Sequence, residues 1–223
     1  MDLLRHINEV NASGFSILSD IYSQEEIEKI IGVIDDADIS GDKFRKSANL
    51  FAIRQFLKEI PDVSSYIFNA QLKDIIKTVF GRDYFIVKSI YFDKPGASNW
   101  FVAYHQDLTI SVTDRIETVG YGPWTVKQNQ FAVQPPLNVL ENIFTVRIHL
   151  DETNEDNGAL KIIPGSHNKG IYRPETINWG SEKEVSCNLP AGGIMLMKPL
   201  LLHSSARTVN ENRRRLFILS SVI

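Results

Sequence analysis

The sequence predicts an α+β chain in which helices come first and an antiparallel double-sheet jelly roll follows. Apolar residues recur at helical spacing through roughly the first eighty residues. From about residue 83 the pattern changes to short runs of β-branched and aromatic residues, which Pro and Gly interrupt. A length of 223 residues suits one domain. We therefore expect a single domain with a helical part over about 1–82 and a jelly roll over about 83–223.

The first helix is predicted over 23–36. Ser23 and Glu26 form a capping-box sequence, and four isoleucines follow at helical spacing. Before it, 14–18 alternates with an apolar bias and is expected to form a short strand.

Two further helical regions are expected before the jelly roll. Apolar residues at helical spacing over 50–60 predict a second helix, which Pro61 ends. A third, interrupted helical region is expected over 63–79, with Gly81 as its C-terminal stop. The apolar stripes of these helices are expected to pack against a sheet.

The strands of the jelly roll are predicted from β-branched and aromatic runs bounded by turn residues. They cover 84–92, 100–104, 143–150, 159–163, 185–188, 194–198 and 216–222. Between Leu108 and Glu141 lies a stretch with little periodicity, and its Gly and Pro residues disfavour regular structure. We expect this stretch to be a mobile lid that becomes ordered over a substrate and excludes water. The alternative is that its aromatic residues pack permanently on the mouth of the barrel.

Composition bounds the class of protein. The hydrophobic content of 43% and charged content of 23% are those of a soluble globular protein. A net charge of −3 gives no support for a nucleic-acid partner. Cys187 is the only cysteine, which excludes an internal disulfide and a multi-cysteine metal site. No run is long and apolar enough to span a membrane or to act as an export signal, so we expect a cytoplasmic protein without a membrane partner.

His105 and Asp107 are the first candidate metal ligands. Residues two apart in a strand project to the same side, so both side chains can bind one ion while Gln106 faces away. Two imidazoles and one carboxylate on one face of a metal leave the other positions open for a cosubstrate and dioxygen, as in non-haem Fe(II) oxygenases. A second histidine is needed, and His203 is preferred over His149 and His167.

Three segments resemble the phytanoyl-CoA dioxygenase family of Fe(II)/2-oxoglutarate oxygenases. They are Tyr104-His-Gln-Asp107, the run Asn157-Gly-Ala-Leu-Lys-Ile-Ile-Pro-Gly-Ser-His167, and His203-Ser-Ser205 followed by Arg214. The resemblance covers about residue 84 to the C-terminus, while the earlier residues match only in being helical. It implies a double-stranded β-helix that binds Fe(II) and uses 2-oxoglutarate.

The resemblance also implies roles for individual residues. His203 would complete the catalytic metal triad with His105 and Asp107, and His167 would be structural. Arg214, eleven residues after His203, would bind the distal carboxylate of 2-oxoglutarate, with Ser205 beside it. Strand alternation puts Arg214 on one face and Arg213 and Arg215 on the other, but both faces look buried, so Arg215 stays the competitor.

Several polar side chains are candidate ligand contacts. Lys88 interrupts an apolar run, either as a snorkelling side chain or at the place where the family has a polar cosubstrate-binding residue. Arg147 shares a strand face with Thr145, and a cation pointing into a barrel needs an anion. That anion is the substrate, 2-oxoglutarate, or a nearby carboxylate such as Asp151 or Glu141. Gln106 and Thr145 are further candidate contacts for substrate or cosubstrate.

The expected function is hydroxylation or desaturation of a small molecule, with dioxygen as oxidant and with release of succinate and CO2. Related halogenases have a small residue in place of the carboxylate, so Asp107 favours hydroxylation or desaturation. Two alternatives stay open from the sequence. One is a non-catalytic jelly-roll binding protein, and the other is a cupin-type metal enzyme that does not use 2-oxoglutarate.

Overall fold

The structure, a computed structural model, describes residues 1–37, 44–47, 50–81, 84–127 and 129–222. Its largest sheet has seven strands, and each pairs antiparallel with its neighbours. In spatial order they are β1 (Phe15–Leu18), β12 (Ile194–Met197), β9 (Ile143–His149), β14 (Arg214–Val222), β4 (Phe85–Lys94), β3 (Leu50–Arg54) and β2 (Phe44–Ser47). Both edges of this sheet come from the N-terminal part, with β1 at one edge and β3 and β2 at the other. The expected division near residue 83 therefore separates strands that belong to one sheet.

A second sheet of four antiparallel strands faces the central part of the first. Its order is β11 (Val185–Cys187), β10 (Leu160–Ile162), β13 (His203–Ser205) and β5 (Val102–His105). Together the two sheets form a double-stranded β-helix, which confirms the predicted jelly roll. Strand β13 was not predicted from the sequence, because its three residues His203–Ser205 contain no apolar side chain.

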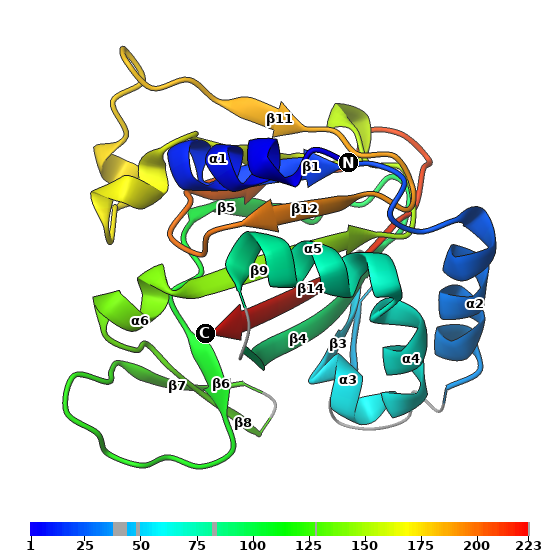
Figure 1. Cartoon of the computed structure of the whole chain (residues 1–223), viewed down its shortest axis with the longest axis horizontal. Coiled ribbons are helices and arrows are strands. Elements are labelled where there is room, and N and C mark those ends of the chain that lie inside the picture. The colour runs from blue at the N-terminus through cyan, green and yellow to red at the C-terminus, as the bar shows by residue number, and fades with distance from the viewer. Residues whose placement is uncertain (38–43, 48–49, 82–83, 128, 223) are drawn as a thin grey trace.

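Of the six described helices, the first five gather on one side of the large sheet, where Figure 1 shows α5 crossing in front of β9 and β14, and the sixth packs in a separate cluster beside the insertion. They are α1 (Leu3–Ser13), α2 (Gln24–Asp35), α3 (Phe56–Glu59), α4 (Ser64–Ile67), α5 (Ala70–Phe80) and α6 (Leu137–Glu141), with short 3-10 turns at Pro61–Val63, Glu155–Asn157, Ser166–Lys169 and Pro174–Thr176. Helix α2 and its capping box are as predicted: Glu26 N donates to Ser23 Oγ at 3.2 Å, and Ser23 N donates to the Glu26 carboxylate at 2.8 Å. None of the described helices is long and apolar enough to cross a membrane.

The predicted helix over 50–60 is wrong in its first half. Residues Leu50–Arg54 form β3 and pair with β4, and only Phe56–Glu59 is helical. Gln55 separates the two with a left-handed φ of 53°, a conformation that interrupts both strand and helix. A short apolar run of this kind fits either period, and pairing with β4 decides the outcome.

The prediction of no regular structure over 108–141 is also wrong. This insertion forms a third antiparallel sheet of β6 (Ile110–Val112), β8 (Gln130–Val133) and β7 (Trp124–Lys127), followed by α6. Asn129 adopts a left-handed φ of 55° in the tight connection from β7 to β8, a conformation that asparagine tolerates well. Figure 1 shows the small sheet beside the end of the large sheet at which β4 begins and β14 ends. Movement of this insertion over the site stays a prediction.

Strand alternation divides the large sheet into two faces with different chemistry. Its outer face packs against the helices in the main hydrophobic core, which includes Phe144, Val146, Ile148, Ile194, Leu196, Phe217 and Leu219. Its inner face looks into the barrel and carries Thr145, Arg147 and His149 on β9 and Arg214, Leu216 and Ile218 on β14. Polar and charged residues thus share the inner face with apolar ones, and they lie between the two sheets.

Candidate active site

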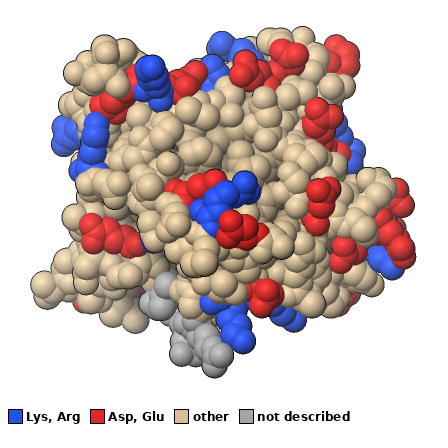
Figure 2. All heavy atoms as spheres, turned by 45° about the horizontal axis from the view of Figure 1, so that its top comes forward, with Lys and Arg blue, Asp and Glu red and all other residues tan. Residues whose placement is uncertain are grey.

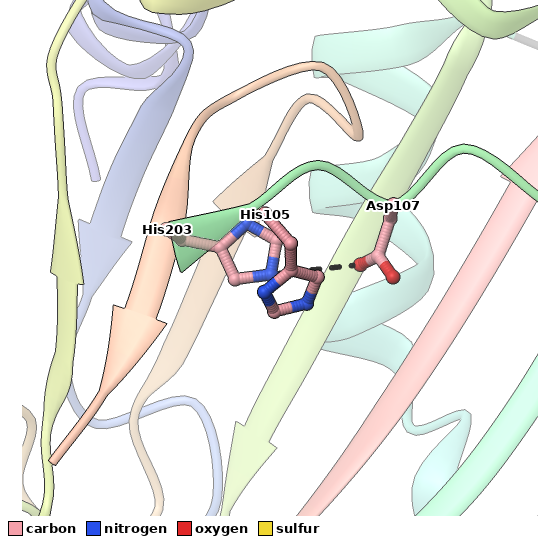
Figure 3. A group of neighbouring side chains, drawn as sticks. All are labelled: His105, Asp107 and His203. Carbon is pink, nitrogen blue, oxygen red and sulfur yellow. Dashed lines mark ion pairs between the residues drawn. The ribbon is translucent and has the colours of Figure 1, made fainter. Parts of the chain in front are cut away.

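Two histidines and an aspartate converge at one end of the small sheet (Figure 3). His105 ends β5 and His203 begins β13, and the two are register partners whose ring centroids lie 4.2 Å apart. The expected same-strand pairing of His105 and Asp107 is wrong, because β5 ends at His105 and Asp107 follows it outside the strand. The Asp107 N–H donates to the Pro199 carbonyl at 2.9 Å, and this bond fixes its backbone beside the cluster. One potential ligand atom from each residue lies within 4.8 Å of the other two. Within the described ranges this is the one group of three or more such side chains suited to a metal ion.

The hydrogen bonds of the two imidazoles prepare them for a metal. His105 Nδ1 lies 2.9 Å from the Ala103 carbonyl, and His203 Nδ1 lies 2.8 Å from the Leu201 carbonyl. A carbonyl can only accept, so each Nδ1 carries the proton and each Nε2 presents a lone pair. Backbone carbonyls orient metal-binding histidines in this way in known metal sites. The donor set therefore fits a divalent transition metal.

Electrostatics keep Asp107 and His203 in their metal-binding forms. Burial by itself raises the pKa of Asp107, but the charges around it outweigh this effect and hold its pKa well below the usual range; the first of them is Lys88, followed by His203, His105 and Arg147. Burial lowers the pKa of His203 to about 4, against the opposing attraction of Asp107. At neutral pH the site thus offers a carboxylate and a neutral imidazole from these two residues.

The site opens into a cavity of about 470 Å³ between the sheets, a volume in the lower half of the range for small-molecule sites. Eight of the nine predicted site residues line it: Lys88, His105, Gln106, Asp107, Arg147, His203, Ser205 and Arg214. The insertion contributes the opposite wall through residues of all three of its strands. The jelly roll therefore brings nearly all of the predicted set to one place.

Arg214 points into this cavity and is 4% exposed. Its guanidinium donates to the Gly158 carbonyl and lies 3.4 Å from Ser205 Oγ, while its Nε has no partner within the described part of the chain. Burial lowers the pKa of Arg214, and the charge of Arg147 lowers it further. A buried guanidinium with an unused N–H and no carboxylate beside it is a site for an anion.

The neighbouring arginines point elsewhere, as strand alternation requires. Arg213 pairs with Asp93, with Nε to carboxylate oxygen at 2.8 Å. Arg215 pairs with Asp151 through two bonds of 2.9 Å and 2.7 Å. Of the three, Arg214 is the one that lines the cavity. The arrangement is the one expected if Arg214, and not Arg215, binds a ligand there.

Lys88 and Arg147 are the other two cations near the metal ligands. Lys88 Nζ lies 3.5 Å from the Asp107 carboxylate, so it contacts a metal-binding group directly. Arg147 is 6% exposed, and its buried Nε has no hydrogen-bond partner among the described residues. Asp151, one of the carboxylates that could have neutralised Arg147, is taken by Arg215. Arg147 therefore retains capacity for a ligand.

Gln106 and Thr145 are less available than the sequence suggested. The Gln106 amide donates to the Gly170 and Leu200 carbonyls and accepts from the Tyr172 amide. Thr145 is fully buried, bonds to Ser220 Oγ at 3.0 Å, and does not line the cavity. Their contact with a ligand stays a prediction.

The two rival histidines lie outside the metal cluster. His149 Nδ1 bonds to Thr153 Oγ1 at 2.7 Å, and burial with the charges of Arg147 and Arg214 lowers its pKa. His167 Nε2 lies 3.2 Å from the Asn11 carbonyl and packs against the end of α1. His167 thus joins the N-terminal helix to the barrel, as a structural histidine would.

Lys94 is a site neighbour that sequence reasoning missed. Its side chain is 1% exposed, its Nζ donates to the Ala206 carbonyl at 2.7 Å, and it is the register partner of Arg214. Gly158 makes this possible, because a Cβ there would lie 2.6 Å from Ala206 O and 2.8 Å from Lys94 Nζ. In the sequence this lysine comes directly before Pro95 and Gly96, which are typical turn residues, so nothing local indicates a buried position.

A double-stranded β-helix with two histidines and a carboxylate at the open end of its barrel defines the class of non-haem metal-dependent oxygenases. The comparison with known families agrees: residues 11–216 match the phytanoyl-CoA dioxygenase (PhyH) family, and the chain belongs to it. It is thus an oxidoreductase of the dioxygenase type. The match begins at residue 11, so the family likeness extends through the N-terminal helices, further than the sequence motifs indicated.

Known proteins with similar sequence or structure include a dioxygenase, a protein solved with 2-oxoglutarate and a non-haem α-ketoglutarate-dependent enzyme. "Dioxygenase cdmD" of Talaromyces verruculosus is 33% identical over 84 residues, which are 38% of this chain and 27% of that protein. EctD from S. alaskensis, solved with 2-oxoglutarate and 5-hydroxyectoine, has a TM-score of 0.74 at 20% identity over 98% of this chain and 75% of its own. SnoK, a non-haem α-ketoglutarate-dependent carbocyclase from nogalamycin biosynthesis, has a TM-score of 0.70 at 12% identity over 98% of this chain and 83% of its own. The structural likenesses establish the fold.

Proposed function

We propose that this protein is an Fe(II)/2-oxoglutarate-dependent dioxygenase that hydroxylates or desaturates a small-molecule substrate and releases succinate and CO2. The observation that carries the proposal is the convergence of two Nε2 lone pairs and one carboxylate beside a cavity that also contains Arg214. Membership of the dioxygenase family and the fold shared with 2-oxoglutarate enzymes support it.

His105, Asp107 and His203 would hold the iron, and the opposite coordination positions would stay open. Bound Fe(II) and 2-oxoglutarate together supply the oxidation of a C–H bond by dioxygen, with oxidative decarboxylation of the cosubstrate. The retained carboxylate of Asp107 occupies the position that a halide would need, which favours hydroxylation or desaturation. Lys88, 3.5 Å from Asp107, keeps that carboxylate ionised and oriented.

Arg214 and Ser205 would bind the distal carboxylate of 2-oxoglutarate. Arg214 has an unused Nε–H, and its Nη2 lies 3.4 Å from Ser205 Oγ, whose hydroxyl donates to the Gly158 carbonyl at 2.9 Å. Arg147 lies near enough to Asp107, His203 and Arg214 to affect the charge of each, and would provide a further donor to cosubstrate or substrate. The three-stranded insertion sheet would cover the reacting end of the cavity and exclude water.

Anaerobic reconstitution with Fe(II), followed by addition of 2-oxoglutarate and oxygenated buffer, tests this function. We expect succinate to form slowly without a substrate and faster with the right one, and we expect His203→Ala to abolish both. A protein that binds Fe(II) but never yields succinate would instead favour a cupin-type metal enzyme that does not use 2-oxoglutarate.

A further inference from the structure

The face of the insertion sheet that lines the cavity is polar. Register pairs place Ser111 opposite Ala132, Thr125 opposite Ala132, and Lys127 opposite Gln130. Paired residues lie on the same face of a sheet, and all five of these side chains line the cavity. We call this set the polar face.

The opposite face of the same sheet is apolar. It carries Ile110, Val112, Trp124, Val126, Phe131 and Val133, which pair with one another across the three strands. Val133 is buried, whereas Val126 is 58% exposed. The insertion therefore presents hydrogen-bonding groups to the cavity. The apolar part of the lining, which includes Ile90, Leu160 and Leu216, comes from the two barrel sheets.

The cavity also has an excess of positive charge. Arg54 lines the cavity and interacts with other residues of the protein. The lining contains four further cations, Lys88, Lys127, Arg147 and Arg214, and one carboxylate, Asp107. The double charges of Fe(II) and 2-oxoglutarate cancel, so loading them leaves this excess unchanged. Lys88 is paired with Asp107. Lys127 makes no ion pair with any described residue, and it projects from the polar face at the cavity wall.

We infer that the substrate is a small hydrophilic anion, with a carboxylate or phosphate group bound by Lys127 and with hydroxyl or amide groups that hydrogen-bond to Ser111, Thr125 and Gln130. This inference rests on the proposed function and adds the substrate class to it. Lys127 is then a specificity-determining residue. Its long side chain and three rotatable donors suit either anion.

A panel of matched compounds tests the inference. It contains hydroxylated carboxylates with their primary amides, phosphate monoesters with their parent alcohols, and medium-chain fatty acids with their amides. Binding to the metal-free protein is measured by the rise in melting temperature and by calorimetry, and succinate formation is measured separately on the iron-loaded enzyme. The carboxylate and phosphate arms distinguish the two anions.

We expect hydrophilic anions to bind and their neutral counterparts to bind at least tenfold more weakly. Lys127→Gln is expected to weaken anion binding about tenfold, Lys127→Arg to retain it, and Lys73→Gln on the exposed face of α5 to leave it unchanged. Two results would overturn the inference: no hydrophilic anion binds, or anions bind equally well to Lys127→Gln. Succinate formation that is stimulated only by neutral or aliphatic compounds would overturn the substrate class but leave the proposed function intact. Anion binding through Lys127 without any succinate would show that the proposed function had failed.

Discussion

At the scale of single residues, the three consecutive arginines Arg213, Arg214 and Arg215 at the start of β14 have different roles because successive side chains of an extended chain point to opposite faces. Arg214→Ala is expected to weaken 2-oxoglutarate binding at least roughly thirtyfold, since loss of one partner of a desolvated charge pair costs about 2–5 kcal/mol. Calorimetry with a redox-inert divalent metal, and the apparent KM in succinate formation, measure the effect.

Arg215→Ala is the matched control for this change. Arg215 pairs with Asp151 away from the cavity, so its loss is expected to lower stability while 2-oxoglutarate affinity stays the same. If Arg215→Ala weakens 2-oxoglutarate binding and Arg214→Ala does not, then the eleven-residue spacing from His203 has been misinterpreted.

Lys94 predicts a dependence of stability on pH. Burial of its ammonium group, and then the charge of Arg214, lower its pKa to about 7, whereas an unfolded lysine titrates near 10.4. Between these values the unfolded chain binds more protons, so raising the pH stabilises the folded protein. Relative to Lys94→Met, we expect the metal-free wild type to gain up to about 1.4 kcal/mol per pH unit between about pH 7 and pH 10. Urea unfolding of both proteins measures this, and a difference that does not change with pH would refute it.

At the scale of elements, the sequence predicted those whose periodicity is long enough to be unambiguous. Helix α2 and strands β4, β9 and β14 extend over seven or more residues, and they position the inner face that holds Arg147 and Arg214. Short strands fall into two groups. Strands β10 and β12 were predicted from apolar runs between turn residues, whereas β3 and β6 fit more than one period and are decided by pairing with distant strands. Lys94 was missed for the same reason, because its environment depends on the register of two strands about 120 residues apart.

The three residues of the candidate metal site could be selected from the sequence because their signal is local in part. His105 and Asp107 lie two residues apart, the motifs around His203 supplied the third candidate, and the structure brings the three side chains together. The polar face was not predicted, although Trp124-Thr-Val-Lys127 and Gln130-Phe-Ala-Val133 do contain alternating polar and apolar residues. Which of its two faces meets the cavity depends on how the sheet packs, and sequence alternation alone does not determine that.

The insertion also predicts a pattern of hydrogen exchange. Amides of β6, β7 and β8 have cross-strand partners and are expected to exchange slowly, whereas 113–123 has no strand and is mostly exposed. We expect exchange in 113–123 to be fast in the ligand-free protein and to slow when 2-oxoglutarate and an anionic substrate are present. Slow exchange throughout 113–123 before ligand is added, unchanged afterwards, would mean that the insertion is a fixed wall and not a lid.

At the scale of the whole molecule, metal binding should stabilise the fold, because the three ligands converge only when β5 and β13 are paired. A ligand at a hundred times its dissociation constant stabilises the folded state by about 2.7 kcal/mol. For a chain of this length that corresponds to a rise in melting temperature of about 5–10 °C. Anaerobic thermal unfolding with and without Fe(II) measures this rise.

His203→Ala is expected to lose the rise in melting temperature. His167→Ala is the matched control, because it also removes a histidine but one that contacts the Asn11 carbonyl outside the metal cluster. It should lower the melting temperature of the metal-free protein and keep the full rise on adding Fe(II). Retention of the rise in His203→Ala would remove that residue from the metal site.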